Sequence, residues 1–261
     1  MTAKILLLSL LSTAVNCWGF VIGNPGQPWL MTGGILPFKN EYCSVRAAYL
    51  NDLVYSQKFQ AQLNIGDGDK PPINRIASET ALITLNLARR LDLYGIVGNA
   101  KLQMDKEVFT QGQLAWGLGA KALMYQGNGL QVGCDFKYFQ TDQTPSYLLS
   151  DGLPLSLASD LTLTYTEYQG AVGFSYQSGI FCPYVAATYL NAKIAPSQNK
   201  FLIRIPGMDE LVDASTRTYA NSNTWGMAVG GSLLMGNKGI LTIESRFINQ
   251  NGIDASLEIR F

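Results

Sequence analysis

The chain of 261 residues contains no histidine, and this absence excludes more than any other feature of its composition. Ser-His-Asp and Cys-His catalysis both need an imidazole, as do the usual zinc sites with histidine ligands. Charge is also sparse, at 15 % of the residues, and the 19 basic and 19 acidic side chains cancel. A balanced charge gives no electrostatic basis for binding nucleic acid. We therefore expect a protein that is not an enzyme and has no nucleic-acid partner.

A long apolar run is missing as well, so the sequence predicts no transmembrane helix. The apolar run of residues 5–15 is too short to span a bilayer as a helix, and it follows the basic Lys4. Small residues at Cys17 and Gly19 complete the pattern of a secretory signal peptide over residues 1–19, with cleavage after Gly19. Cys17 also allows a lipoprotein signal, which Asn16 before it disfavours.

Cysteine is scarce in the chain that this cleavage leaves. It keeps Cys43, Cys134 and Cys182, an odd number, so one thiol is free or pairs with another molecule. Export places the chain in an oxidising compartment where disulfides form. Cys134 lies among apolar residues and is expected to act as a small hydrophobic side chain. Cys43, in a polar segment, is the disulfide candidate.

The pattern that is present is an alternation with a period of two, clearest in residues 114–141. Leu114, Trp116 and Leu118 fall on one face of its first arm, and Lys121 falls on the other. Such alternation predicts a strand, and the Gly127-Asn128-Gly129 sequence between the arms predicts a tight hairpin turn. Each arm is about as long as a tilted membrane-crossing strand of roughly 9–11 residues. Two architectures fit, a secreted β-sandwich and an outer-membrane barrel.

The spacing of turns favours an all-β, transmembrane, antiparallel up-and-down barrel. Short turns at 89–90, 127–129, 178–179 and 236–239 alternate with longer loops at 60–76, 142–160 and 194–222, which is typical of outer-membrane barrels. The expected strands are ten, at residues 44–55, 80–89, 91–101, 114–126, 130–141, 163–176, 181–192, 224–234, 241–248 and 255–261. Twelve strands are possible if residues 194–222 hold a further hairpin. Residues 20–43 are then a periplasmic N-terminal segment and residues 44–261 the barrel.

The same alternation assigns charged side chains to the inside of the barrel. Arg or Lys facing lipid costs about 2–4 kcal/mol at the midplane, so charges on strands are expected to face inward. The predicted pore-lining residues are Arg46, Asp52, Lys121, Asp135, Lys137, Glu167, Glu244, Arg246, Glu258 and Arg260. Both signs occur, so strong ion selectivity is not evident. Because ten strands enclose a narrow lumen, the alternative is that these residues pair with each other and fill it.

No motif for a cofactor accompanies this pattern. The glycines of residues 226–231 (GMAVGG) lie within a strand pattern and are not followed by a helix, so they do not form a phosphate loop. We recognise no metal cluster or catalytic constellation either, and we expect no cofactor. Glycines at alternate strand positions are expected to serve barrel geometry. Trp116, Tyr168, Tyr176 and Trp225 are candidates for aromatic girdles at the lipid surface.

Several segments resemble the chlamydial major outer membrane protein, a porin family. They are residues 20–28 (FVIGNPGQP), 86–98 (NLARRLDLYGIVG), 114–141, 165–189 (YTEYQGAVGFSYQSGIFCPYVAATY) and 225–261, in the family's order. The terminal Phe261 also resembles the signal that the outer-membrane insertion machinery reads. The chain is shorter than the family and has fewer cysteines, which departs from the family's disulfide-linked envelope role.

The resemblance implies the outer membrane of a Gram-negative, chlamydial bacterium as the location, membrane lipid as the surroundings, and homo-oligomers as a possible assembly. The function it implies is a porin-like channel for passive diffusion of small solutes or ions. The alternative is a non-conducting structural or adhesive barrel that acts through its loops at 142–160 and 194–222. A polar, open lumen would favour the channel, and a lumen filled by paired charges would favour the alternative.

Overall fold

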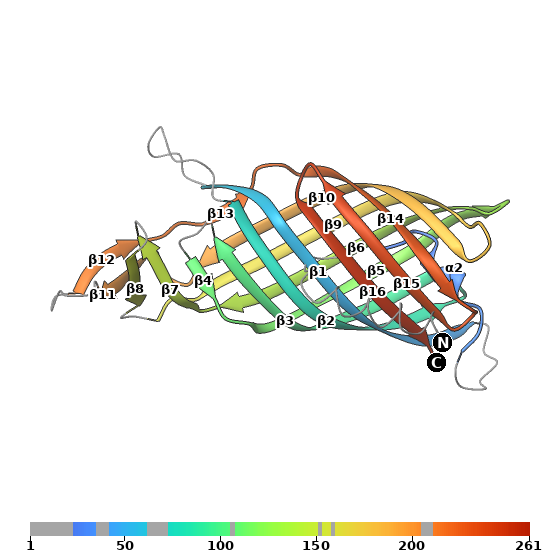
Figure 1. Ribbon diagram of the computed structural model, residues 1–261, viewed down its shortest axis with the longest axis horizontal. Coiled ribbons are helices and arrows are strands. Elements are labelled where there is room, and N and C mark those ends of the chain that lie inside the picture. The colour runs from blue at the N-terminus through green and yellow to red at the C-terminus, as the bar shows by residue number, and fades with distance from the viewer. Residues whose placement is uncertain are drawn as a thin grey trace, which may run out of the picture.

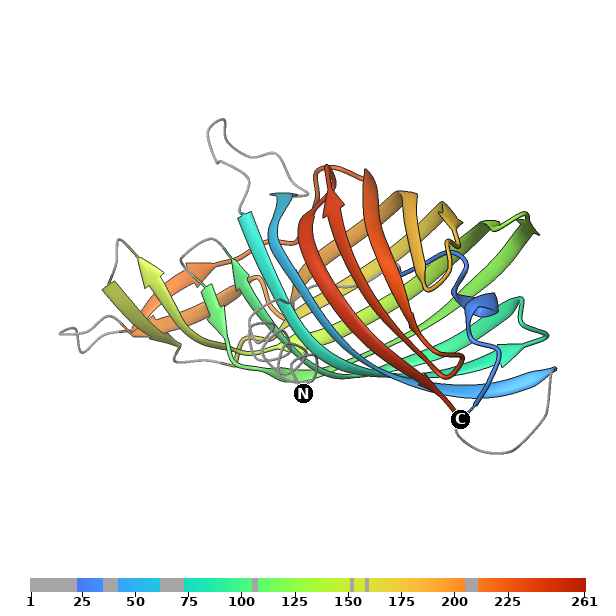
Figure 2. The ribbon, with the colours of Figure 1, turned by 45° about the vertical axis from the view of Figure 1, so that its right-hand side comes forward.

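The computed structural model describes residues 23–34, 42–61, 73–104, 108–150, 153–157, 160–204 and 211–261. The predicted signal peptide lies outside the described residues. Ten long antiparallel strands close into a barrel: β1 (Cys43–Ala61), β2 (Ile73–Leu87), β3 (Leu91–Met104), β5 (Gln113–Gly127), β6 (Leu130–Gln143), β9 (Leu163–Tyr176), β10 (Phe181–Pro196), β14 (Trp225–Met235), β15 (Gly239–Phe247) and β16 (Asn251–Arg260). Each pairs with the next, and β1 pairs with β16 to complete the circle (Figures 1 and 2). The predicted ten-stranded barrel is confirmed.

One end of the barrel, which we call the short-turn end, holds four tight turns between strands. The first strand of the wall, β1, begins at this end, and the last strand, β16, finishes there. Asn128 and Gly129 have φ of 50° and 80°, as a two-residue hairpin turn requires. The turn between β2 and β3 uses Ala88 and Arg89, with φ of 50° and 57°, one residue earlier than predicted. No helix of the described residues is long and apolar enough to cross a membrane.

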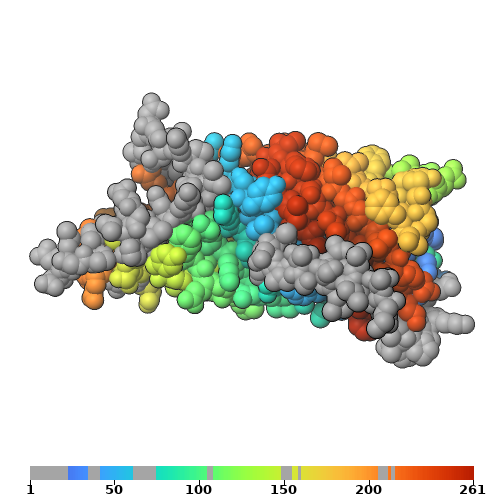
Figure 3. Space-filling view, in the orientation of Figure 1, coloured from blue at the N-terminus to red at the C-terminus, as the bar shows by residue number. Residues whose placement is uncertain are grey.

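The opposite end, the long-loop end, carries short strands where the sequence predicted loops. They are β4 (Val108–Thr110), β7 (Pro145–Ser150), β8 (Leu153–Leu157), β11 (Lys200–Arg204), β12 (Leu211–Ser215) and β13 (Tyr219–Asn221). All but β13 pair in the order β4, β7, β8, β11, β12 into a sheet that projects from β3, here called the end sheet (Figures 1 and 3). The hairpin of β11 and β12 therefore exists within residues 194–222, but it stands outside a barrel of ten strands rather than twelve.

The outward and inward faces of the strands carry the side chains that the alternation predicts. Outward positions expose large apolar residues such as Leu118 and Phe136, while inward positions are buried. Toward the long-loop end, buried apolar residues form one cluster that includes Phe59, Leu190 and Ile194, and a few buried polar side chains such as Gln57 and Gln143 lie beside it. We call this the apolar core. Strands of a barrel pack their inner faces against one another only if side chains fill the space between them, and here they do.

A segment before β1 lies inside the short-turn end. Residues Gly23–Gly34, here called the N-terminal plug, include the short helix α2 (Gln27–Leu30), which has Pro28 in its first turn. Figure 2 shows this segment in blue across the short-turn end of the barrel. Most of its residues are buried, including Asn24, Leu30 and Met31. Residues 23–34 of the predicted N-terminal segment thus lie against the inside of the barrel wall, and the periplasmic location predicted for residues 20–43 stays a prediction.

Candidate functional site

All ten charged residues predicted to face inward lie inside the barrel. The side chains of Arg46, Asp52, Lys121, Asp135, Lys137, Glu167, Glu244, Arg246 and Glu258 are at most 8 % exposed, and Arg260 is 6 % exposed as a residue. A water-filled lumen leaves the side chains that line it accessible to water. The observed burial means that neighbouring side chains fill the space around these groups. Their role in conduction stays a prediction.

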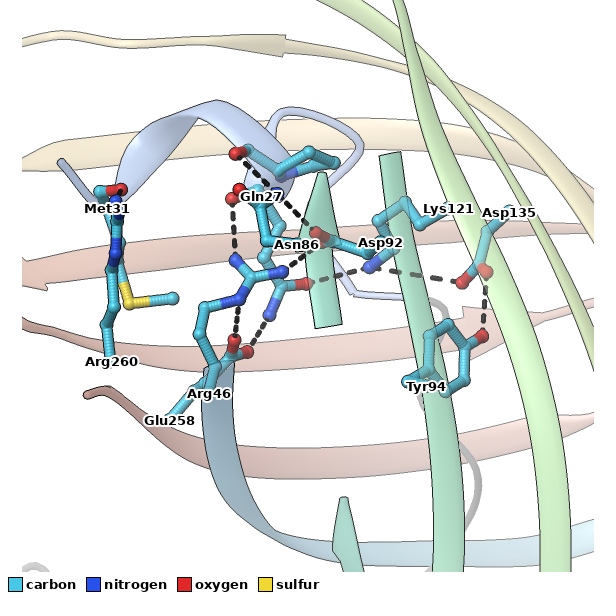
Figure 4. A network of polar contacts seen from close by, with 11 residues as sticks. Gln27, Met31, Arg46, Asn86, Asp92, Tyr94, Lys121, Asp135, Glu258 and Arg260 are labelled. Carbon is cyan, nitrogen blue, oxygen red and sulfur yellow. Dashed lines mark hydrogen bonds and ion pairs between the residues drawn. The ribbon is translucent and has the colours of Figure 1, made fainter. Parts of the chain in front are cut away.

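Near the short-turn end, Arg46 joins two strands and the plug (Figure 4). Its guanidinium pairs with Asp92 and, at 2.8 Å between Nε and Oε1, with Glu258. Asn86 donates to Asp92 Oδ1 at 2.6 Å. A planar guanidinium can serve two carboxylates at once, which a lysine ammonium does with less geometric control. This group ties β1 to β3 and to its neighbour β16 on the inner face of the wall.

Gln27 of α2 completes that network from the centre of the lumen. Its side chain accepts a hydrogen bond from Lys121 Nζ at 2.7 Å and donates to Glu258, and its carbonyl accepts from Arg46 Nη1 at 3.1 Å. Lys121 in turn lies 3.9 Å from Asp135. One glutamine therefore contacts charged groups on three wall strands, so the plug is held by specific polar contacts.

The rim of the barrel holds the part of the plug that contains Trp29 and Met31. Arg260 donates to the carbonyl of Met31, and Arg89 donates to the carbonyl of Trp29 at 3.2 Å. The Arg89 guanidinium also lies 3.7 Å from the centre of the Trp29 ring, a cation–π contact. These contacts place Arg260, a predicted pore-lining residue, at the rim and against the plug.

Small residues on the opposite wall make room for the plug. Gly133 and Gly173 pair across β6 and β9, and Gly173 pairs with Ala186 on β10. A Cβ added to Gly173 would stand 2.6 Å from Pro25 Cγ, and one added to Gly133 would collide with the Pro25 carbonyl. These glycines, expected from the sequence to serve barrel geometry, allow the close approach of Pro25.

Asn24 anchors the deepest part of the plug. Its Nδ2 donates to the carbonyl of Cys182 and to Ser232 Oγ, both at 3.1 Å, and its Oδ1 accepts from the Gly26 amide. Cys182 is buried beside it, and Cys134 is half-buried on the outward face. Cys43 is the first residue of β1, and the disulfide predicted there stays a prediction.

Three carboxylates form a row in the middle of the barrel, here called the mid-barrel row. Asp52 pairs with Asp254 across β1 and β16, and Asp254 pairs with Glu244 across β16 and β15. Arg246 contacts Asp52 and lies 3.9 Å, measured from Nε, from Glu244 Oε1 and Asp254 Oδ2. Close by in the lumen, Lys137 lies 3.7 Å from Glu167. The lumen is thus filled by paired charges.

At two places in the wall, a tyrosine ring packs over a glycine on the next strand and its hydroxyl donates a hydrogen bond to a carboxylate. Tyr94 lies against Gly119 on the next strand and donates to Asp135 Oδ1 at 2.7 Å. Tyr184 lies against Gly230 in the same way and donates to Glu244 Oε2 at 2.8 Å. A side chain at either glycine would block the ring. The repeated arrangement explains two glycines by the hydrogen bonds that they permit.

Sequence reasoning missed several of these residues. Asp254 was outside the strand expected at residues 255–261, although its parity matches that of Glu258. Asp92 is separated from Tyr94 and Ile96 by even numbers of residues and therefore shares their inward face. The alternation could have identified it as an inward residue. Gln27 had no periodic signal because it lies in an irregular segment. Among the described residues, no three Cys, Asp or Glu side chains are placed to hold a metal ion.

On the outer surface, aromatic rings follow one another toward the long-loop end. Tyr138 lies 5.4 Å from Trp116 and 5.0 Å from Tyr168, measured between ring centres. Tyr189 and Trp225 form a further edge-to-face pair at 5.4 Å. These rings are arranged as a partial girdle, the position predicted for Trp116, Tyr168 and Trp225.

Comparison with known proteins agrees with this architecture. No family model matches the chain. The curated relatives include the major outer membrane porins of Chlamydia trachomatis serovar B, 20 % identical, and serovar L1, 21 % identical. Each alignment covers 99 % of this chain and 98 % of the relative. The chain is similar over nearly its whole length to the chlamydial major outer membrane porins. The resemblance seen in the sequence is confirmed, and the barrel is an outer-membrane protein.

Solved outer-membrane proteins are matched at low structural similarity. The outer membrane protease OmpT from Escherichia coli has a TM-score of 0.44 at 10 % identity, over 87 % of this chain and 99 % of that one. The translocator domain of the autotransporter NalP from Neisseria meningitidis has a TM-score of 0.46 at 11 % identity, over 87 % and 90 %. At these scores neither carries an argument about function.

Proposed function

We propose that this chain is a non-conducting structural barrel of the outer membrane that holds the end sheet at the cell surface. One observation carries the proposal: the charged residues inside the barrel are buried, with Asp52, Glu244 and Asp254 at 0 % exposure. In outer-membrane barrels the short turns are periplasmic and the long loops extracellular. That orientation places the plug at the periplasmic mouth and the end sheet outside.

Three kinds of filling along the barrel axis support this proposal. The plug fills the short-turn end, paired charges fill the middle, and the apolar core, with Phe59 and Leu190, fills the long-loop end. Ion conduction needs a continuous path of water or polar groups. The apolar core fills most of the outer mouth with hydrophobic side chains, so an ion leaving the charged middle meets a barrier there.

The end sheet supplies surface that a structural or adhesive barrel can use. Tyr147 is 40 % exposed and stacks on Phe109 at 4.9 Å between ring centres. Leu211 and Val212 on β12 are exposed as well. Exposed aromatic and aliphatic side chains of this kind are typical of surfaces that contact other molecules. A copy of the same chain in the envelope is a partner that this surface could serve.

The second candidate is a porin-like channel for small solutes or ions, and it too has support. The relatives are named porins, and the similarity covers nearly all of both chains. A cavity of about 40 Å³ also lies between the plug and the wall, lined by Arg46, Asp92, Lys121 and Asp135 among others. Such a space holds a few water molecules, at roughly 10–15 Å³ for each.

A planar-bilayer recording separates the two. The processed protein, residues 20–261, is refolded into lipid, and its folding is checked by the shift in electrophoretic mobility on heating. Folded protein that passes no discrete current over many insertions, beside a conducting porin as a positive control, agrees with the structural barrel. Discrete conductance steps from the same sample would sink that proposal and establish the channel.

The expectation that the chain is not an enzyme stays a prediction. One of the similar solved structures is a protease, but its TM-score of 0.44 carries no argument for this chain.

A further inference from the structure

Arg260 differs from the other cations that were predicted to face the lumen. Each of the other four pairs with at least one carboxylate of the wall, and they are Arg46, Lys121, Lys137 and Arg246. Within the part of the chain that the structure describes, Arg260 pairs with no carboxylate, although the residue is only 6 % exposed. A buried charge without an opposite charge costs stability. Arg260 is therefore the inward cation at which an external anion would be most favourable.

The neighbours of Arg260 repel its charge. Arg260 pairs directly with Arg46 across β16 and β1, and like charges at opposite positions of a sheet repel. Asp92 and Glu258 form their ion pairs with Arg46 and not with Arg260. The charged groups that act on Arg260 are both cations, Arg46 and Arg89. An anion bound at Arg260 would relieve this repulsion.

The guanidinium of Arg260 is held from one side and keeps a binding edge. Its Nη1 donates to the carbonyl of Met31, and Figure 4 shows the two residues side by side. Its Nε has no hydrogen-bond partner among the described residues. Nε and Nη2 together form the planar fork with which an arginine binds two oxygens of a carboxylate or a phosphate. The contact with Met31 therefore orients the group and leaves this fork for an oxyanion.

The rim around Arg260 is basic. The backbone amide of Arg260 donates to the carbonyl of Lys238 at 2.9 Å, so Lys238 lies on the adjacent turn. Lys238 and Arg90 are exposed, and Arg89 is half-buried. No acidic residue occurs in the four tight turns of this end, at residues 88–90, 127–129, 177–180 and 236–238. The field at this mouth therefore attracts anions.

We propose that Arg260, with Lys238 and Arg89 beside it, is a binding site for a phosphate group at the short-turn mouth. A phosphate has enough oxygens to accept from the Arg260 fork and from a neighbouring cation at the same time. The headgroup of a phospholipid and the free phosphate ion both supply this chemistry. Leu257 and Phe261 are exposed apolar side chains close to Arg260 in the sequence, and they suit contact with acyl chains. The site goes beyond the structural role proposed above and does not depend on it.

Thermal unfolding in a detergent without phosphorus tests binding of the free ion. The processed protein is refolded in dodecyl maltoside, and inorganic phosphate is titrated against chloride at constant ionic strength. A ligand that binds only the folded protein raises the unfolding temperature in a saturable way. We expect this rise in the wild type and in Arg217→Gln, which changes an exposed guanidinium of the long-loop end. In Arg260→Gln we expect no rise beyond that caused by chloride.

Native mass spectrometry tests binding of the lipid headgroup. The protein is mixed with dioleoyl phosphatidylglycerol or with dioleoylglycerol, which has the same acyl chains and no phosphate. We expect the wild type to retain one phosphatidylglycerol about tenfold more than dioleoylglycerol, and R260Q to lose this preference. Retention of phosphatidylglycerol assigns the site to a lipid headgroup. A response to inorganic phosphate without lipid retention assigns it to the free ion.

Two further variants separate the planar fork from the charge and from folding. Arg260→Lys keeps the charge and loses the fork, so we expect it to weaken phosphate binding about tenfold. If changes at Arg260 prevent folding, Lys238→Gln changes an exposed side chain of the same site. Because its ammonium is exposed to water, we expect K238Q to weaken binding about two- to fivefold.

Two results would overturn the proposal. The first is a wild type that responds to phosphate no more than to chloride and retains phosphatidylglycerol no better than dioleoylglycerol. The second is phosphate binding of wild-type strength in a folded variant of Arg260 or, where those variants do not fold, in K238Q. Binding of that kind would lie elsewhere on the protein. Conductance does not enter either readout, so the proposed structural role and this site fail or hold separately.

Discussion

The two ends of the barrel interior are filled by different kinds of interaction, polar at one end and hydrophobic at the other. At the short-turn end, Arg46 and Gln27 hold the plug through hydrogen bonds and ion pairs that need one geometry. At the long-loop end, Phe59 and Leu190 fill the lumen as an ordinary hydrophobic core. Apolar packing tolerates substitutions that keep volume, whereas a buried polar network fails when one partner is lost. The comparison therefore predicts that the two ends differ in which substitutions they tolerate.

The largest effect is expected from removing the guanidinium at the centre of the polar half. Arg246→Met leaves Asp52 and its neighbours as unpaired buried charges, which costs about 3–5 kcal/mol of unfolding free energy. Urea unfolding in detergent or lipid measures the loss. Arg217→Met, at an exposed position, is the control and should cost little. Equal stability of the two variants would contradict the charged network as a structural element.

At the apolar end, the size of the change should matter more than its chemistry. Leu190→Ala is expected to cost about 2–5 kcal/mol, and Leu190→Met less than about 1.5 kcal/mol. Leu118→Ala, on the outer face, is the matched control. At the polar end we expect even a conservative change to be costly. Arg46→Lys keeps the charge but loses the planar guanidinium that serves two carboxylates, so we expect it to be poorly tolerated. Equal tolerance at both ends would break the comparison.

The fit between plug and wall can be tested on a single strand. Gly173→Val drives a side chain into Pro25 and is expected to cost about 1–3 kcal/mol. Gly170→Val is the control, since a Cβ at Gly170 meets nothing within 4 Å. With Cys43 and Cys134 replaced by serine, maleimide should label Cys182 faster in G173V than in G170V. Equal labelling rates would show that Pro25 does not depend on this glycine.

The smallest effect concerns the tyrosines that lie over glycines. Tyr94→Phe removes the hydrogen bond to Asp135 and is expected to cost about 1–2 kcal/mol, because a buried acceptor loses its donor. Tyr184→Phe should cost a similar amount through Glu244. Tyr168→Phe, on the outer face, should change the unfolding free energy by less than either. A cost as small as that of the control would leave these hydrogen bonds without a structural role.

Alternation was enough to predict the wall of the barrel, because lipid and lumen impose opposite requirements on successive side chains. It placed residues such as Lys137 and Glu258 inside, and the structure has them there. It missed the end sheet, because strands of five residues such as β8 are too short to show a period. Asp254 was missed by a boundary error of a few residues.

The plug could not be predicted by any periodic signal. Pro25 and Gly26 indicated an irregular segment, and an irregular segment is usually at the surface. What holds it inside is tertiary: Gln27 faces charged groups that come from β1, β5 and β16. A glutamine carries no mark of such partners in the sequence. The glycines opposite Pro25 are visible in the sequence, but their close contact with Pro25 is seen only in the three-dimensional structure.

The seam between β1 and β16 has a consequence for the order of assembly. It joins the first and last strands of the wall, and the plug touches both of its sides, through Arg46 on β1 and Glu258 on β16. The contacts of the plug with this seam therefore form only after both β1 and β16 are in place. The hydrogen bond from Arg260 to the carbonyl of Met31 likewise requires the end of β16 to lie at the rim. Closure of the barrel and placement of the plug are therefore coupled through the same two strands.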